Sequence, residues 1–208
     1  MSGDQRQAAE EVVKRAARER VALTRFLYVD HGGIVRGKAA ATARLAERIS
    51  SGIGHTRAMM AMSMMDELAT VEGMGPVGEV RIKPDISTFV TLPYARGAAA
   101  MLADQVNLDG RPWEGCARTF LKEAVAELAA AGYELRAAFE PEFSLGRYEG
   151  ASFTPIDESL CYSATGFHLA HDYTIDLVDA LLEQGLEVEH YYPELGHGQQ
   201  EVPIRYAT

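Results

Sequence analysis

The segment from Glu134 to Leu145 constrains the fold most, because apolar and polar residues alternate along it as they do in a half-buried strand. This alternation puts Glu140 and Glu142 on the same face, about 7 Å apart by the rise of a strand. Two carboxylates at that spacing repel each other unless a cation lies beside them. The segment is therefore either a solvent-facing strand with two ordinary glutamates or one wall of a cation site.

A second group of carboxylates favours the cation site. Glu189, Glu194 and Glu201 lie in E-H-Y-Y-P-E-L-G-H-G-Q-Q-E, where glycines flank a tight loop between two strand-like runs. A hairpin of this kind can bring Glu194 and Glu201 towards one point, and neighbouring strands can add Glu140 and Glu142. Carboxylate oxygens are the ligands that Mg²⁺ and Mn²⁺ prefer. We therefore expect a site for Mg²⁺ or Mn²⁺, metals that handle phosphates.

The first hundred residues predict a small sheet with one or two helices. Residues 4–20 have the pattern of a charged, alanine-rich helix, and residues 22–38 that of two strands joined by the turn H-G-G. The methionine-rich run 59–65 is expected to pack in the core. Further strands are predicted at 79–82 and at 87–93.

The rest of the chain follows a turn-rich joint at 108–112 and alternates between helix and strand. One helix is predicted over 113–131, with Gly132 as its stop, and another over 172–183, ending at Gly185. Strands are expected at 134–145, 186–192 and 199–206. The whole pattern predicts an α+β fold.

The composition argues against several classes of protein. Hydrophobic residues make up 47% of the 208, which is enough for a substantial core. With 20 basic against 30 acidic residues and no concentrated basic window, neither nucleic acid nor an anionic membrane is an expected partner. No apolar run approaches the roughly 20 residues of a membrane span, and the first residues lack a signal-peptide core, so we expect a cytoplasmic protein. Cys116 and Cys161 suit reduced thiols.

Two motifs together resemble the glutamine synthetase family. F-E-P-E-F at 139–143 resembles its strand of two metal-binding glutamates, and E-L-G-H-G-Q-Q-E at 194–201 its E-x-(G/A)-x-G-Q-x-E loop. R-F-L-Y-V-D-H-G-G-I-V-R-G-K resembles the opening hairpin of the family's β-grasp domain, and K-P-D-I-S-T-F-V-T-L-P-Y its P-D-x-S-T strand. The resemblance covers residues 21–208. It implies an N-terminal helix over 1–20, a β-grasp domain over 21–110, and the first part of the antiparallel-sheet catalytic domain over 111–208.

The resemblance also implies a chemistry, because the family uses ATP to convert glutamate to γ-glutamyl phosphate and then joins it to ammonia or another amine. By resemblance, Glu142, Glu194 and Glu201 hold one metal, and Glu140 helps to hold a second metal that bridges the nucleotide phosphates. The same resemblance assigns Glu189 and Tyr206 to the nucleotide, with Tyr206 against adenine. Strand alternation puts Tyr206 on the opposite face from Glu201, so this assignment requires a bend, for which Pro203 is the candidate.

Asp66 is the best positional match to the family aspartate that attracts ammonium, accepts its proton, and comes from the adjacent subunit. The surrounding A-M-S-M-M-D differs from the F-D-G-S-S of ammonia-using members. The expected acceptor is therefore ammonia or, slightly preferred, a small amine such as methylamine, ethanolamine or a polyamine. The resemblance further implies a homo-oligomer, a dodecamer of two stacked hexameric rings.

Two other functions stay open at this point. Family members are about twice as long as this chain, and we expect these 208 residues alone to be inactive. The chain is accordingly either part of a longer ligase or a truncated, catalytically inactive member that serves as an interaction or regulatory subunit. A weaker alternative is an unrelated carboxylate–metal phosphohydrolase, which would release phosphate without glutamate.

Overall fold

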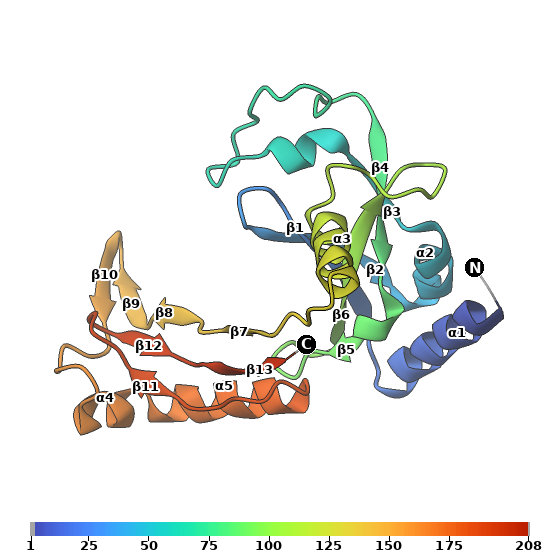
Figure 1. Cartoon of the computed structure of the whole chain (residues 1–208). Coiled ribbons are helices and arrows are strands. Elements are labelled where there is room, and N and C mark those ends of the chain that lie inside the picture. Colours follow the sequence, from blue (N-terminus) through green and yellow to red (C-terminus); the bar gives the residue numbers. More distant parts are fainter. Residues whose placement is uncertain (1–2, 208) are drawn as a thin grey trace. The chain divides into compact units, whose positions relative to one another are not determined.

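The computed structural model describes residues 3–207 and divides into two compact units, Met1–Tyr133 (unit 1) and Glu134–Thr208 (unit 2) (Figure 1). Both units combine helices with sheets, which confirms the predicted α+β fold. None of the helices within residues 3–207 is long and apolar enough to cross a bilayer.

Unit 1 is built on one mixed sheet in the order β2-β1-β6-β4-β3, with β5 pairing to β6. Strands β1 and β6 run parallel, and the other neighbours are antiparallel, which is the arrangement of a β-grasp sheet. The hairpin predicted over 22–38 is confirmed as the β1–β2 pair. The strands are β1 (Leu23–Val29), β2 (Val35–Ala41), β3 (Ile53–Thr56), β4 (Glu79–Pro84), β5 (Val90–Thr91) and β6 (Ala98–Val106).

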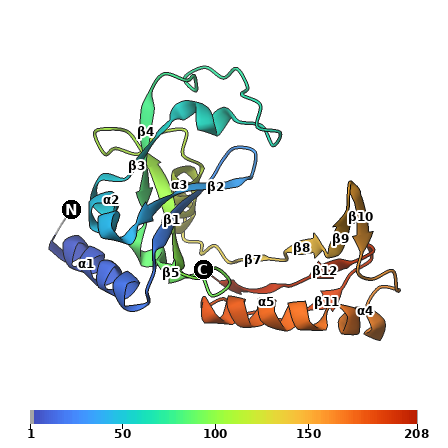
Figure 2. The same cartoon turned by 180° about the vertical axis from the view of Figure 1, so that it is seen from behind.

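Within the described part of unit 1, residues 3–133, three α-helices and three short 3₁₀ turns accompany this sheet, and α1 contacts α2 (Figure 2). The predicted helices over 4–20 and 113–131 are confirmed as α1 and α3, and Gly132 follows α3 with a φ of 86°. The core joins sheet and helices through Phe26, Leu45 and Trp113, each at most 2% exposed. The elements are α1 (Gly3–Arg18), η1 (Thr42–Arg44), α2 (Leu45–Ser51), η2 (Arg57–Ala61), η3 (Ile86–Thr88) and α3 (Ala117–Ala130).

The strand predicted over 87–93 is mostly wrong. The segment forms the turn η3 and the two-residue strand β5, because hydrogen bonds to Asp85 hold residues 87 and 88 in a turn. Its carboxylate accepts hydrogen bonds from the Ser87 amide and hydroxyl at 3.2 and 2.6 Å, and its carbonyl accepts one from the Thr88 hydroxyl at 2.7 Å. Such local side-chain bonds compete with strand pairing.

The methionine-rich run 59–65 packs in the core only in part. Met60 is 1% exposed, as predicted, but Met64 and Met65 are 74% and 76% exposed, so the prediction is wrong for these two. The chain turns outward there because the Ser63 hydroxyl accepts hydrogen bonds from the amides of Met65 and Glu67.

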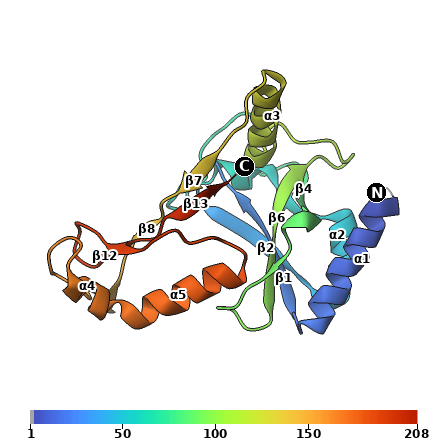
Figure 3. The same cartoon turned by 60° about the horizontal axis from the view of Figure 1, so that its bottom comes forward.

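Unit 2 consists of short antiparallel strands and two helices, and α5 runs alongside β12 and β13 (Figures 1 and 3). The helix predicted over 172–183 is confirmed as α5, and Gly185 follows it with a φ of 80°. The sheets are β8-β12-β11, β7-β13 and β9-β10. The elements are β7 (Ala137–Phe139), β8 (Glu142–Ser144), β9 (Gly146–Glu149), β10 (Ser152–Pro155), α4 (Ala164–Leu169), α5 (His171–Glu183), β11 (Tyr192–Pro193), β12 (Gln199–Glu201) and β13 (Ile204–Ala207).

Both long strands predicted in unit 2 are interrupted by a proline. The segment 134–145 forms β7 and β8 with a break at Pro141, and the segment 199–206 forms β12 and β13 with a break at Pro203. Proline cannot donate a ladder hydrogen bond, so pairing stops there. The amide of Val202 donates to the carbonyl of Pro141 at 3.1 Å and joins the two breaks. The strand is therefore interrupted before Tyr206, at the proline that the sequence suggested for the bend.

The strand predicted over 186–192 is also largely wrong. Within this stretch only Tyr192 belongs to a strand, the two-residue β11, and Val188 makes an isolated bridge to Ile204. Glu189 still donates its amide to the carbonyl of Pro203 at 2.9 Å, so the segment is held beside the break without a regular ladder.

Candidate functional site

Two of the predicted carboxylates lie directly opposite each other on neighbouring strands of unit 2. Strand β12 lies between β8 and β11, and Glu201 pairs in register with Glu142 on one side and with Tyr192 on the other. Residues directly opposite in antiparallel strands point to the same face of a sheet. Glu142, Glu201 and Tyr192 therefore form one row of side chains, which we call the carboxylate row.

Glu201 is the buried member of this row, with 5% of its surface exposed. The phenol of Tyr192, opposite Glu201 in the β11–β12 register, lies close enough to hydrogen-bond to its carboxylate. Hydrogen bonding to Glu201, burial, and the negative charges of Glu201 and Glu140 together raise the pKa of Tyr192 well above its usual range. The phenol is therefore a neutral donor, and Glu140 lies close enough to act on it electrostatically.

Glu194 begins the glycine-rich loop that leads from β11 to β12. Its carboxylate accepts hydrogen bonds from the Tyr162 phenol at 3.3 Å and from the Leu195 amide at 2.7 Å. The Glu194 charge is the main cause of a raised pKa of Tyr162. Gly198 in this loop has a φ of 67°, and a Cβ there would lie 2.4 Å from the carbonyl oxygen of Leu145, so only glycine fits.

Gln199 connects the loop to Glu142. Its side-chain oxygen accepts a hydrogen bond from the Gly196 amide at 2.8 Å, and its side-chain nitrogen donates to Glu142 at 2.5 Å. Glu142 is exposed apart from this contact. The amide thus fixes the loop and holds the Glu142 side chain in one position.

No cation within residues 3–207 forms an ion pair with Glu140, Glu142, Glu194 or Glu201. Within the same range, no three histidine, cysteine, aspartate or glutamate side chains are placed to hold a metal ion. The donor set has the charge and the hard oxygen atoms that suit Mg²⁺ or Mn²⁺. Closing it around an ion requires these side chains to move closer together, while the bonds from Gln199 and Tyr162 leave other lone pairs of Glu142 and Glu194 available.

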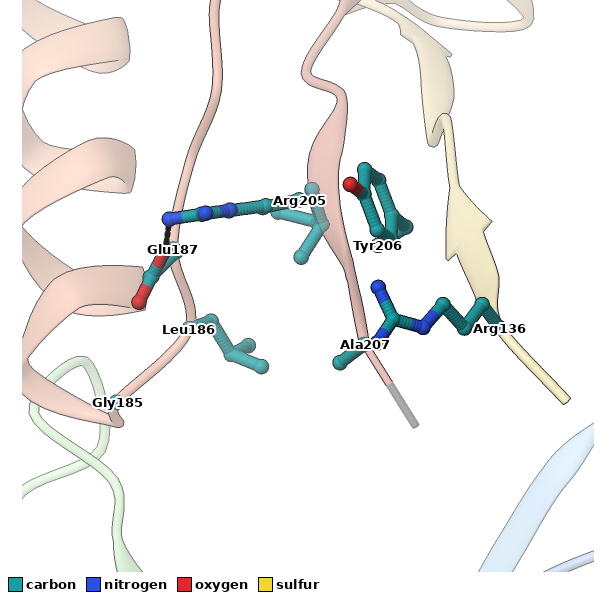
Figure 4. Close-up of a pocket in the computed structure, with 8 residues that line it drawn as sticks. Arg136, Gly185, Leu186, Glu187, Arg205, Tyr206 and Ala207 are labelled. Atoms are coloured by element: carbon teal, nitrogen blue, oxygen red, sulfur yellow. Dashed lines mark hydrogen bonds and ion pairs between the residues drawn. The ribbon is translucent and has the colours of Figure 1, made fainter. Parts of the chain in front are cut away.

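The two residues assigned to the nucleotide lie elsewhere in unit 2. Tyr206 on β13 is 55% exposed and lines a hollow of about 530 Å³ next to Arg136, whose guanidinium carbon lies 6.0 Å from the ring centroid (Figure 4). Arg205 and Glu187 form an ion pair of 2.8 Å at the same hollow. Glu189 is exposed and does not line it.

Asp66 lies in unit 1, in the turn that exposes Met64 and Met65. Its backbone adopts a left-handed φ of 58°, and its carboxylate accepts a hydrogen bond from Arg36 at 2.8 Å while the side chain stays 72% exposed. Arg36 also binds the buried Asp30 at 2.5 Å. Burial raises the pKa of Asp30, but the bonds from Arg36 and from the Ile34 amide outweigh it and lower that pKa overall.

Sequence reasoning missed four polar side chains around these residues. Tyr162, Tyr192 and Gln199 contact the carboxylates, and Arg136 lies against Tyr206. Gln199 stands inside the recognised loop motif and could have been noticed there. The pairing of Tyr192 with Glu201 depends on the register of β11 against β12, and no sequence pattern gives that register.

Comparison with known proteins agrees with this geometry. Residues 7–113 match the model of the glutamine synthetase N-terminal domain, and residues 114–208 match that of the glutamine synthetase catalytic domain. Fold and sequence thus define an α+β chain whose carboxylate-rich unit lies within the part that matches the catalytic-domain model. The chain belongs to the glutamine synthetase family.

Among curated relatives, the gamma-glutamylpolyamine synthetase of Streptomyces coelicolor is 34% identical over 181 residues, which are 85% of this chain and 39% of that protein. A gamma-glutamylanilide synthase of Acinetobacter is 28% identical and covers 95% of this chain and 46% of its own length. The glutamine synthetase of Thermus thermophilus is also 28% identical. The chain spans less than half the length of these relatives.

Solved structures agree on the fold. The crystal structure of a novel glutamine synthase homolog superimposes with a TM-score of 0.79 at 32% identity, covering 90% of this chain and 44% of that one. The GmaS/ADP complex gives a TM-score of 0.81 at 22% identity and covers 94% of this chain and 44% of that one.

Proposed function

We propose that this chain is part of an ATP-dependent ligase that joins ammonia or a small amine to the γ-carboxylate of glutamate through γ-glutamyl phosphate. The observation that carries the proposal is the carboxylate row with Glu194 beside it. These carboxylates have no cationic partner within residues 3–207, and Glu201 among them is buried. Membership of the glutamine synthetase family supports the same reading.

The chemistry explains why carboxylates are needed. Transfer of a phosphoryl group to a carboxylate brings two anions together, and bound Mg²⁺ or Mn²⁺ would supply the positive charge that neutralises them. We assign Glu142, Glu194 and Glu201 to one metal and Glu140 to a second. Gln199 and Tyr162 would each keep one hydrogen bond to Glu142 and Glu194, and the remaining lone pairs would face the ion.

For the nucleotide we retain Tyr206 and Glu189. The half-exposed ring of Tyr206 lies in a hollow beside the Arg136 guanidinium, and a planar base suits such a surface. Glu189 is proposed from its place five residues before Glu194 in the family motif, and its exposure leaves its carboxylate accessible.

For the amine we propose Asp66, acting in the site of a neighbouring copy within a dodecamer of two hexameric rings in the cytoplasm. Arg36 fixes the Asp66 carboxylate from one side and leaves most of its surface exposed, as a proton acceptor requires. An amine other than ammonia is favoured by the similarity to proteins named for polyamines, anilide and isopropylamine.

An amine panel tests this proposal. The complete protein that contains this chain is purified and incubated with Mg²⁺, ATP and glutamate plus ammonia, methylamine, isopropylamine, ethanolamine, aniline or spermidine. The γ-glutamyl amides are measured by mass spectrometry together with ADP. We expect ADP release to depend on glutamate and one amine to give the most product. Phosphate release without glutamate would instead identify a phosphohydrolase. If the protein shows no turnover and binds no Mn²⁺, it is instead a non-catalytic interaction or regulatory subunit.

A further inference from the structure

Tyr192 holds a position that the metal ligands alone do not explain. It stands opposite Glu201 in the β11–β12 register, with its phenol close enough to hydrogen-bond to that carboxylate. Its ring is confined on two sides. The Tyr162 ring meets it edge-on at 5.2 Å and 90°, and the His190 ring stacks on it at 5.4 Å and 17°. A phenol held in this way has little freedom to point elsewhere.

Glu201 needs such a partner because it is buried and forms no ion pair with a cation of residues 3–207. A buried carboxylate without hydrogen bonds is costly, and a charged partner would compete with a metal ion for the same oxygens. A neutral phenol avoids both problems. It occupies one of about four lone-pair positions of the carboxylate and leaves the others available.

The neighbouring tyrosine provides an internal contrast. Tyr191 precedes Tyr192, and its hydroxyl donates to the side-chain amide oxygen of the buried Gln200. The two tyrosines are adjacent in the chain, and so are their partners Gln200 and Glu201 on β12. Tyr191 hydrogen-bonds to the neutral amide of Gln200, whereas Tyr192 lies within hydrogen-bonding reach of the Glu201 carboxylate, which we assign to the metal.

We propose that Tyr192 is a positioning residue that fixes the Glu201 carboxylate for a divalent cation. This inference rests on the proposed function, because it assumes that Glu201 binds the metal. Hydrogen bonds that orient metal ligands contribute substantially to metal affinity, and their removal typically costs about 10–100-fold.

The test measures Mn²⁺ affinity by electron paramagnetic resonance on the whole protein. Tyr192→Phe, which removes only the hydroxyl, is expected to weaken Mn²⁺ binding by about 10-fold or more. Tyr191→Phe is the matched control and is expected to bind Mn²⁺ like the wild type. In a Glu201→Gln background, Tyr192→Phe is expected to have no further effect, because a residue that acts through Glu201 loses its role when Glu201 is changed.

Two further readouts separate positioning from mere structural support. Adding Mn²⁺ is expected to change the tyrosine ultraviolet spectrum of the wild type and of Tyr191→Phe, but to change that of Tyr192→Phe less. The melting temperatures of metal-free Tyr192→Phe and Tyr191→Phe are expected to be similar. The spectral change in the wild type needs no variant, so it tests the inference even if a variant folds poorly.

The outcomes distinguish the inference from the function beneath it. If Glu201→Gln weakens Mn²⁺ binding and Tyr192→Phe does not, the positioning role is wrong and the metal site stands. If the wild type binds no Mn²⁺, both the metal assignment and the role of Tyr192 are wrong.

Discussion

In unit 1 most of the deeply buried side chains are apolar, whereas in unit 2 many of the buried side chains carry amides or carboxylates. Phe26 and Leu45 of unit 1 are fully buried, as is Gln200 of unit 2, and Glu201 is 5% exposed. Both units expose some large apolar side chains, such as Val77 at 89% in unit 1 and Leu160 at 85% in unit 2, so the difference lies in what is buried. Unit 1 is therefore stabilised mainly by apolar burial.

The same difference explains why we propose the metal site in unit 2. Buried polar groups are tolerated only when hydrogen bonds satisfy them, and in unit 2 those bonds also orient the carboxylates. Tyr192 lies within hydrogen-bonding reach of Glu201, and the Gln199 side-chain amide donates a hydrogen bond to Glu142. In unit 1 the polar network around Arg36 is local, and the surrounding core fixes the sheet that carries it.

The comparison is tested most strongly by removing a core side chain of unit 1, which is expected to have the largest effect on the free energy of unfolding. Phe26→Ala is expected to lower the free energy of unfolding by about 3–5 kcal/mol, because it leaves a cavity in the core. Urea unfolding followed by the fluorescence of Trp113, the single tryptophan, reports directly on unit 1.

The control for this prediction is Leu160→Ala in unit 2, followed by circular dichroism. Its side chain is 85% exposed, so the change is expected to stay within about 0.5 kcal/mol. Equal losses from the two substitutions would show that apolar burial does not distinguish the units.

A smaller effect is expected from acid, and it belongs to unit 1. Burial and the charge of Lys38 lower the pKa of His55 to about 4. Gln105 donates its side-chain amide to Nε2 of His55 at 3.1 Å, which requires a neutral ring. As the pH falls from about 6.5 towards about 4, the unfolded chain takes up this proton first, so the stabilising contribution of neutral His55 is progressively lost.

His55→Gln removes this titration. We expect the Trp113 unfolding midpoint of the wild type to fall more steeply with decreasing pH, between about 6.5 and 4, than that of the variant. Parallel pH curves for the two proteins would contradict the role of His55.

How far the sequence predicts the fold depends on whether the signal is local. Helices α1, α3 and α5 and the β1–β2 hairpin follow from periodicity and turn residues, so they were predictable. The central strand β6 was missed because its sequence A-A-A-M-L-A-D-Q-V is poor in strand-forming residues. It is a strand because its neighbours β1 and β4 pair with it from both sides.

The candidate site shows the same limit. The glutamates at 142, 194 and 201 could be selected from motif and charge, and Glu142 and Glu201 lie opposite each other in the β8–β12 register. Their hydrogen-bond partners could not be selected, because these depend on which strands pair and in which register. Pro141 and Pro203 carry a visible signal of interruption, and giving it more weight would have divided both long strands correctly.

The most direct test of the central claim is a Mn²⁺ titration of the wild type beside Glu142→Ala, with Glu149→Ala on β9 as the matched control. The account predicts that the wild type and Glu149→Ala bind Mn²⁺, and that Glu142→Ala loses affinity while its circular dichroism spectrum stays unchanged. Unchanged Mn²⁺ binding in Glu142→Ala, or loss of its fold with binding retained, would contradict the assignment of the carboxylate row to the metal.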